Sequence, residues 1–355
     1  MADAASATRA VLRDPQAQGD THAISYHLPV HYFVTGATGF VGSYVTSQLL
    51  AAGHDVTALV RTREDGLDIA EYGVRPHIGS VTNKEGLRPG IRGVDGVIHS
   101  AGHRVTFSKR KTMHAVNVVG SRNVFELVRE LSIPKCVFTS TLNAFSDTKG
   151  IAVDESHRFT GKHLTEYDRV RAEVHFDLAL PMMNKGVPIV ALLPGMVYGP
   201  RDTSPMAHLI SRAMLNRVLA VSATTAYSWA HVMDVAHAHL LAMQFGRPGE
   251  SYIVGGPGHT VREALKIAGK SAGRKRDPIP IPSWLARGAG TVVRELSYVV
   301  PRWRRTADRL RIAAGVTYLG DDSKARQELG FAPRSLAEGL PDAARASLGE
   351  MIEGS

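Results

Sequence analysis

The sequence contains a single cysteine, Cys136, so no disulfide bond can form within the chain. Its setting in the apolar stretch KCVFTS predicts a buried, unreactive thiol. The sequence also lacks any run of about 18 uncharged apolar residues, so we predict no transmembrane helix. Residues 1–28 lack the apolar centre of a signal peptide and predict a flexible N-terminal tail. Together these absences favour a cytoplasmic protein.

Acidic residues are the scarcer charge, because 33 Asp and Glu stand against 42 Lys and Arg, for a net charge of +9. A basic protein can bind nucleic acid, an anionic membrane surface or a phosphorylated ligand. The basic residues are densest over residues 292–311, where the pattern predicts a solvated helix face. No recognition motif surrounds them, so we expect no nucleic-acid partner. With Trp284 and Trp303 the region also suits an apolar substrate entrance or a membrane surface, which we rank lower.

From His31 onward, short β-rich runs alternate with stretches whose apolar residues recur at helical spacing. That alternation is typical of a parallel sheet with right-handed crossover helices. We therefore predict an α/β fold, with a Rossmann-type doubly wound parallel sheet over residues 29–200. A smaller C-terminal substrate-binding lobe follows over residues 201–355, and some of its segments return to the core. The predicted strands are HYFVTG, DVTALV, RPHIG, GVIHSA, KCVFTS and IVALLPG.

The most informative local motif is the glycine-rich segment VTGATGFVGSYV, which joins the first predicted strand to the first predicted crossover helix. Gly36 allows a tight turn, Gly39 lets the backbone approach a pyrophosphate, and Gly42 lets helix and strand pack closely. The helix N-terminus offers unpaired N–H donors to the anion. We predict a dinucleotide-binding loop whose cofactor-binding residues are Gly36, Thr38, Gly39, Phe40, Val41 and Gly42.

The end of the second predicted strand indicates which dinucleotide binds. A site that prefers NAD places Asp or Glu there for the ribose hydroxyls, whereas this chain has Val60 followed by Arg61. A carboxylate would repel a 2′-phosphate, and an arginine can hold one in a charge-assisted bidentate pair. We therefore predict NADP(H) in preference to NAD(H).

With this loop, the strand GVIHSAG, the segment NVVGSRNV, the strand end FTST and a Tyr four residues before a base, the chain resembles the extended (atypical) short-chain dehydrogenase/reductase, or NAD-dependent epimerase/dehydratase, superfamily. The likeness spans about residues 31–348 and includes LLPGMVYGPRD and WAHVMDVAHAHLLAM. The segments PIPIPSWLARG and DSKARQELGFAPRSLAEGL resemble the dihydroflavonol reductase and 3β-hydroxysteroid dehydrogenase branch more than nucleotide-sugar epimerases.

The resemblance implies a role for each residue that matches the superfamily pattern. Thr141 falls at the active-site Ser/Thr position, where its hydroxyl would hydrogen-bond the substrate oxygen. Tyr167 falls at the general acid/base, and Arg171 at the lysine that holds the nicotinamide ribose and assists the tyrosine. The other positions that the resemblance places beside the cofactor are Ser80, Ser100, Ala101, Gly102, Asn117, Pro194, Gly195 and Val197.

Two of these residues depart from the superfamily pattern. Arg171 gives YxxxR in place of YxxxK, on the same helix face as Tyr167. It keeps the positive charge, but a guanidinium cannot copy the compact contact of an ammonium with two hydroxyls and does not release a proton. Ser80 stands where an aspartate usually contacts the adenine amine, at a cost of about 1 kcal/mol. We expect a slower or altered enzyme that still binds cofactor.

The leading hypothesis is an NADP(H)-dependent oxidoreductase that reduces a lipophilic ketone or aldehyde, or oxidises the matching secondary alcohol. Two alternatives remain open, a redox-neutral epimerase or isomerase on the same scaffold and a cofactor-binding pseudoenzyme. The resemblance also implies a homodimer formed through two long helices. We expect no metal, because no usual zinc spacing relates the clustered residues His231, Asp234, His237 and His239.

Overall fold

The computed structural model describes residues 4–14, 29–103, 110–218, 220–274, 277–282 and 315–343. Trp284, Trp303 and the basic stretch of residues 292–311 lie outside these ranges, and so do the predictions made for them. None of the helices in the described ranges combines the length and the apolar composition needed to cross a membrane.

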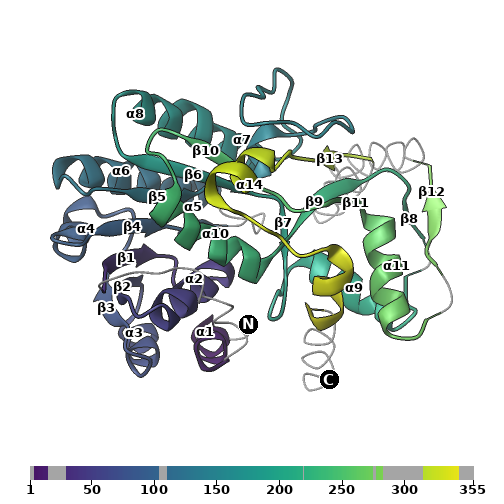
Figure 1. The fold of residues 1–355 in the computed structure, drawn as a ribbon, viewed down its shortest axis with the longest axis horizontal. Helices are drawn as coiled ribbons and strands as arrows, with labels where there is room; N and C mark the ends of the chain where they lie inside the picture. Colours follow the sequence, from purple (N-terminus) through teal and green to yellow (C-terminus); the bar gives the residue numbers. More distant parts are fainter. Residues whose placement is uncertain are drawn as a thin grey trace.

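Seven parallel strands form the central sheet, in the order β10-β6-β5-β4-β1-β2-β3 (Figure 1). The six predicted strands and the doubly wound α/β fold are confirmed. The seventh strand comes from the C-terminal part of the chain and places Ser251 opposite Ala191 of β6. The strands are β1 His31–Thr35, β2 Asp55–Val60, β3 Arg75–Ile78, β4 Gly96–His99, β5 Cys136–Thr139, β6 Ile189–Pro194 and β10 Ser251–Val254.

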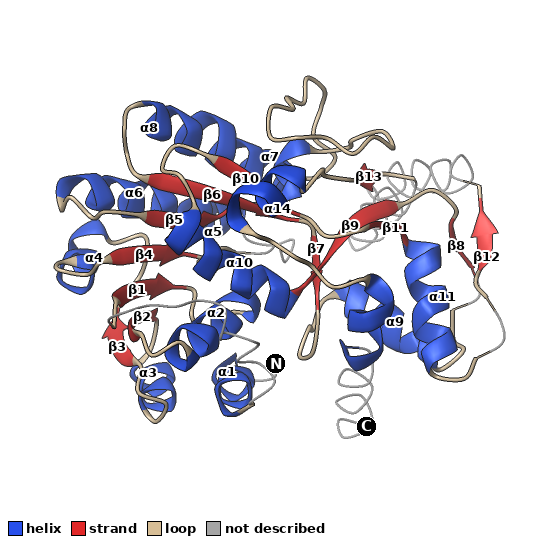
Figure 2. Cartoon of the chain, viewed as in Figure 1, coloured by secondary structure: helices blue, strands red, loops and turns tan. Residues whose placement is uncertain are grey.

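Helices cover both faces of the sheet (Figure 2). Alternate residues of a strand face opposite sides, so Tyr32 and Val34 join one apolar cluster and Phe33 joins the other. The buried Cys136 belongs to the second cluster, and burial raises the pKa of its thiol, as the sequence predicts for an unreactive cysteine. The helices are α2 Phe40–Ala51, α3 Arg63–Ala70, α10 Val232–Phe245 and α14 Ser323–Leu329 on the first face, and α4 Lys84–Ile91, α6 Gly120–Glu130 and α7 Glu166–Ala172 on the second.

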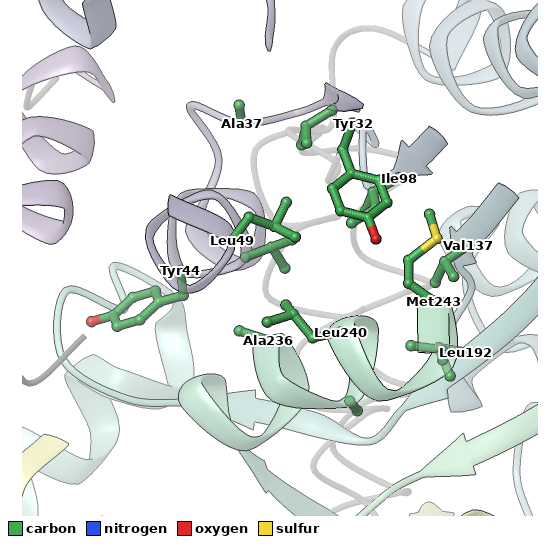
Figure 3. Packing of buried hydrophobic residues seen from close by; sticks show 14 of the residues in the cluster. Tyr32, Ala37, Tyr44, Leu49, Ile98, Val137, Leu192, Ala236, Leu240 and Met243 are labelled. Atoms are coloured by element: carbon green, nitrogen blue, oxygen red, sulfur yellow. The ribbon is translucent and has the colours of Figure 1, made fainter. Parts of the chain in front are cut away.

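The first cluster lies between the sheet and the helix pair α2 and α10, which pack against each other (Figure 3). Leu49 of α2 and Leu240 of α10 are fully buried there beside Ile98 and Val137 of the strands. Burying side chains of this size contributes about 1.5–3 kcal/mol each. The packing fixes α2, and therefore the glycine loop that precedes it, on the sheet.

Two long helices on the second face each contain a π-helical segment. Helix α5 (Arg110–His114) continues through η3 (Ala115–Val119) into α6, and α7 continues through η5 (Glu173–Ala179) into α8 (Leu180–Asn184). Such segments are rare in proteins, and those that occur often lie near functional sites. One of them contains Asn117, and the other begins two residues after Arg171.

The N-terminal residues depart from the prediction. A loose tail is expected over residues 1–28, but Ala4–Arg13 form helix α1, which packs on α2 and α3. Val11 and Leu12 are buried in the first cluster, and the Thr8 hydroxyl donates to the Thr38 carbonyl oxygen over 3.2 Å. The tail prediction is therefore wrong for these ten residues, because the adjacent side chains of Val11 and Leu12 pack against α2 and α3.

The C-terminal lobe lies beside the sheet, at the right of Figure 1. Its β9 pairs with β7, β11 and β13, while β8 pairs with β12. Tyr198, Trp229 and Leu265 belong to a third apolar cluster inside it. Its elements are β7 Met196–Tyr198, α9 Pro205–Met214, β8 Ala220–Ser222, β9 Ala226–His231, β11 Gly258–Thr260, α11 Val261–Ser271, β12 Ile279–Ile281 and β13 Thr317–Tyr318.

Candidate active site

The glycine-rich loop has the geometry of a phosphate cradle. Gly36 has a φ of +77°, and a Cβ there would lie 2.7 Å from the Ala101 backbone nitrogen. A Cβ on Gly42 would lie 2.0 Å from the Gly36 carbonyl oxygen, so only glycine permits this contact between helix α2 and the turn that follows β1. Gly39 is exposed and precedes α2 without a side-chain cap, which leaves the N–H groups of the first turn available to an anion. These residues fit a dinucleotide pyrophosphate.

The carboxyl ends of β1 and β4 lie next to the glycine-rich loop. Thr35 accepts the Ser100 N–H through its carbonyl oxygen over 3.1 Å, and its hydroxyl accepts the Ala101 N–H over 3.2 Å. The same hydroxyl hydrogen-bonds His99 Nδ1 over 2.7 Å. Burial and then the charge of Arg171 lower the pKa of His99 to about 3, so this histidine is a neutral structural link. Gly102 follows and is exposed.

Arg61 and Ser80 lie at the carboxyl ends of β2 and β3, and both are exposed. The structure gives the Ser80 hydroxyl a hydrogen bond of 2.8 Å with Thr82, so this serine is already engaged within its own turn. Beyond Arg61, Thr62 accepts the Asp65 N–H and begins helix α3. The predicted 2′-phosphate contact therefore falls on an accessible arginine at the sheet edge where ligands of such folds bind.

The three predicted catalytic residues come from two adjacent elements. Thr141 precedes the 3₁₀ turn η4 (Leu142–Phe145), which packs against α7. Tyr167 lies in the first turn of α7, where Thr165 accepts the Asp168 N–H as the N-cap. Tyr167 is half-buried against the second apolar cluster, and Arg171 follows one turn later.

Arg171 is buried and turned toward the strand ends. Its Nη2 donates to the Thr139 carbonyl oxygen over 2.6 Å, and its guanidinium lies 5.8 Å from the centre of the Phe138 ring. A Cβ added to Gly102 would lie 3.5 Å from Arg171 Nη1 and 3.3 Å from Asn117 Oδ1. The structure thus brings Arg171, Asn117 and Gly102 together. Arg171 Nε is buried without a hydrogen-bond partner, which leaves one donor for a bound group.

Pro194, Gly195 and Val197 lie where β6 passes into β7. A Cβ on Gly195 would lie 2.1 Å from the Ser228 carbonyl oxygen, so packing on β9 is sufficient to require glycine there. Val197 is half-buried against the first cluster and pairs with Ala230. The contribution of these three residues to cofactor binding stays a prediction.

Sequence reasoning misses a buried carboxylate beside Tyr167. Asp168 accepts hydrogen bonds from Asn143 Nδ2 over 2.9 Å and from the Tyr318 hydroxyl over 3.0 Å. Burial raises its pKa, while hydrogen bonds from Asn143, Thr165 and Tyr318 act in the opposite direction. The pattern TEYD reads as a helix start, and the two partners lie 25 and 150 residues away, so no local signal reveals the network.

Three of the four clustered residues of HVMDVAHAH, namely His231, Asp234 and His239, are held by separate structural partners. Asp234 forms a bidentate ion pair with Arg334, whose Nη2 donates to Oδ1 over 2.7 Å and whose Nε donates to Oδ2 over 3.0 Å. His231 begins α10 by accepting the Met233 N–H, and His239 bonds Thr139 Oγ1 over 2.8 Å. His237 lies on the same helix and is half-buried.

A cleft of about 560 Å³ opens on another side of α7. Arg169, Ala172 and Glu173 contribute to its lining from α7 and the start of η5. Helical geometry puts Arg169 and Glu173 opposite Tyr167 and Arg171, so this cleft is separate from the predicted catalytic face.

Comparisons with known proteins bear on the family and the fold of this chain. Residues 32–255 match the model of the NAD dependent epimerase/dehydratase family. A 4-hydroxy-2-methyl-3-oxo-4-farnesyl-3,4-dihydroquinoline-1-oxide ketoreductase of Stigmatella aurantiaca is 31% identical over 85% of this chain and 92% of its own. A putative dihydroflavonol 4-reductase of Synechocystis is 29% identical, over 88% and 93%. The crystal structure of gox2253 is 27% identical, with a TM-score of 0.79 over 90% of this chain and 98% of its own. The predicted resemblance is confirmed.

Proposed function

This chain belongs to the NAD-dependent epimerase/dehydratase family, and we propose that it is an NADP(H)-dependent oxidoreductase acting on a lipophilic ketone or the matching secondary alcohol. The observation that carries the proposal is the meeting of Arg171, Asn117 and Gly102 at the strand ends. Of these, Arg171 lies on the helix that carries Tyr167. A charged group, a proton donor and an open glycine edge together suit hydride transfer beside a bound nicotinamide.

The proposal assigns a role in the reaction to Tyr167, Thr141 and Arg171. When bound, the reduced nicotinamide supplies the hydride that the carbonyl carbon accepts. Tyr167 donates its hydroxyl proton to the substrate oxygen, and Thr141 hydrogen-bonds the same oxygen. Arg171, held by the Thr139 carbonyl, keeps a positive charge on the face of α7 that carries Tyr167. The Nε donor that has no partner is available to a ribose hydroxyl.

The NADP(H) preference rests on Arg61. This side chain is exposed where β2 ends, and no carboxylate occupies that position to repel a 2′-phosphate. The lipophilic substrate class is supported by the ketoreductase relative, whose substrate carries a farnesyl chain by name, at 31% identity over most of both chains.

The test is a titration of the purified protein with NADPH and with NADH, followed by nicotinamide fluorescence. We expect tight NADPH binding that weakens about 10- to 100-fold in Arg61→Ala, the range for a charge-assisted hydrogen bond. Arg75→Ala is the matched control, because Arg75 is exposed at the opposite end of the sheet and pairs with Asp55. If the protein binds neither NADPH nor NADH, the proposal is wrong.

A second assay separates oxidation and reduction from the alternatives. Lipophilic ketones are added with NADPH, and the loss of NADPH absorbance is compared with the alcohol formed. Equal amounts of both indicate a reductase. Conversion of the substrate without net loss of NADPH indicates a redox-neutral isomerase, and cofactor binding without any conversion indicates a pseudoenzyme.

A further inference from the structure

The buried network around Asp168 runs from the C-terminal lobe to Thr141. Tyr318 of β13 donates to Asp168 Oδ2 over 3.0 Å, and Asn143 donates from Nδ2 to Asp168 Oδ1 over 2.9 Å. Thr141 Oγ1 in turn donates to Asn143 Oδ1 over 3.2 Å. Asp168 and Tyr318 are 1% and 3% exposed, so water does not replace either bond.

The carboxylate determines which way the Asn143 amide faces. Asp168 Oδ1 accepts from Asn143 Nδ2, and a carboxyl oxygen that carries no proton only accepts hydrogen bonds, so it requires the NH₂ group of Asn143 on its side. The opposite orientation would place two acceptor oxygens 2.9 Å apart in a buried site. The amide oxygen of Asn143 therefore faces Thr141.

This orientation sets the direction of the Thr141 hydroxyl. A hydroxyl has one proton to donate and two lone pairs to accept with. The proton is directed to Asn143 Oδ1, and one lone pair accepts the Asn143 backbone N–H over 3.3 Å. One lone pair remains for a substrate. In this state Thr141 accepts a hydrogen bond from an alcohol, and it donates to a ketone only after releasing Asn143.

We propose that Asp168 is a positioning residue that acts through Asn143 to set Thr141 as a hydrogen-bond acceptor, so that the resting site prefers the alcohol over the ketone. The inference rests on the proposed function, because that proposal places Thr141 at the substrate oxygen. Tyr318 supports Asp168 from the other side, and Tyr227 stacks on Tyr318 with ring centres 5.6 Å apart.

The experiment compares variants that break the network at different points. Asp168→Leu combined with Tyr318→Phe replaces both partners of one buried bond by apolar groups, which limits the loss of stability, and frees the Asn143 amide to turn. Asn143→Ala removes the acceptor of the Thr141 proton directly. Tyr318→Phe alone keeps the carboxylate and the amide orientation and is the matched control.

The kinetic readout is the KM for 1-phenylethanol with NADP⁺ and the KM for acetophenone with NADPH. In the double variant and in Asn143→Ala, we expect the alcohol KM to rise about two- to tenfold, the factor for one neutral hydrogen bond, while the ketone KM stays or falls. The reaction equilibrium then requires a compensating change in the ratio of the two kcat values. Tyr318→Phe should keep the ratio of the two KM values. Equal changes of both KM values in the first two variants would overturn the inference.

A second readout does not depend on hydride transfer. The side-chain NH₂ signals of Asn143, identified in ¹⁵N-resolved NMR spectra by their loss in Asn143→Ala, should exchange slowly with solvent in the unaltered protein and rapidly in the double variant. Rapid exchange in the unaltered protein overturns the inference even if the enzyme turns over. Slow exchange without turnover of any ketone supports the amide orientation and contradicts the proposed function instead.

Discussion

Arg171 Nη2 donates a hydrogen bond to the Thr139 carbonyl oxygen over 2.6 Å, which joins helix α7 to the end of strand β5. The bond explains how an arginine is accommodated where the superfamily pattern has lysine. The longer guanidinium reaches the strand end with one nitrogen and keeps another near Gly102. The positive charge therefore stays buried between the helix and the sheet, with a hydrogen-bond partner that holds it in place.

Arg171→Met should lower both activity and stability. The change removes the charge from the predicted catalytic face and takes the donor away from the half-buried Thr139 carbonyl, at a cost of about 1–3 kcal/mol of unfolding free energy. Arg171→Lys keeps the charge and should retain more activity than the methionine variant. Urea unfolding and kcat measurements on both variants check this. Equal kcat values for the two variants would show that the charge has no part in the reaction.

Tyr167→Phe should remove the proton donor without disturbing the fold. We expect kcat to fall about 10²- to 10⁴-fold, the usual contribution of general acid–base catalysis, while NADPH affinity stays the same. The tyrosine is half-buried and its ring is kept, so the melting temperature should change little. Cofactor titration, kcat and thermal melting of the one variant decide the point. A kcat that stays within a factor of about two would remove Tyr167 from the mechanism.

The central sheet could be predicted because most of its strands are apolar runs bounded by turn residues, and their crossovers follow a fixed handedness. The sequence does not predict the seventh strand, SYIV, because three apolar residues in a glycine-rich stretch carry little signal. Helix α1 was missed because its apolar residues gain a partner only from α2 and α3, which folding brings to it.

The glycine loop and the Tyr167–Arg171 spacing are local, so the sequence reveals them. The contacts that orient those residues are not local. Arg171 reaches Thr139 across 32 positions and Asp168 reaches Tyr318 across 150, and a single sequence carries no signal for such pairs. The direction of the Arg171 side chain, inward to a carbonyl, therefore had to come from the structure.

Acid should destabilise the protein through its buried histidines. Burial lowers the pKa of six described histidines below the ordinary 6.5, four of them to about 3 or 4, so the unfolded chain binds protons that the folded chain excludes. The stability that these histidines contribute is therefore fully present above pH 6.5, and it is lost as the pH falls from 6.5 toward about 3. Each group contributes about 1.4 kcal/mol per pH unit. The lowered pKa values are about 3 for His99, His175 and His231, and about 4 for His239.

His239→Gln tests one member of this set. Glutamine can still hydrogen-bond Thr139 Oγ1 but does not titrate, so the fall in stability between pH 6.5 and 4 should become less steep by about 1.4 kcal/mol per pH unit. Urea unfolding at a series of pH values gives the slope. His208→Gln is the control, because His208 is exposed. An unchanged slope in His239→Gln would mean that His239 is protonated alike in the folded and unfolded states.

Helix α1 should matter for both stability and cofactor binding. Val11→Asp places a carboxylate in the first apolar cluster, where Val11 is 2% exposed, and should detach the helix. Losing the burial of Val11 and Leu12 lowers the unfolding free energy by roughly 3–6 kcal/mol. Detachment also breaks the Thr8 bond to the Thr38 carbonyl of the glycine loop, so NADPH should bind more weakly.

Leu67→Asp is the matched control for the helix, because Leu67 is 63% exposed on the neighbouring α3 and should tolerate the same charge. Thermal melting and NADPH titration are compared between the two variants. If α1 is docked as described, Val11→Asp alone lowers the melting temperature and the cofactor affinity. A melting temperature for Val11→Asp equal to that of Leu67→Asp would mean that α1 contributes nothing to the folded core. A lowered melting temperature with unchanged NADPH affinity would mean that α1 stabilises the fold without holding the glycine loop.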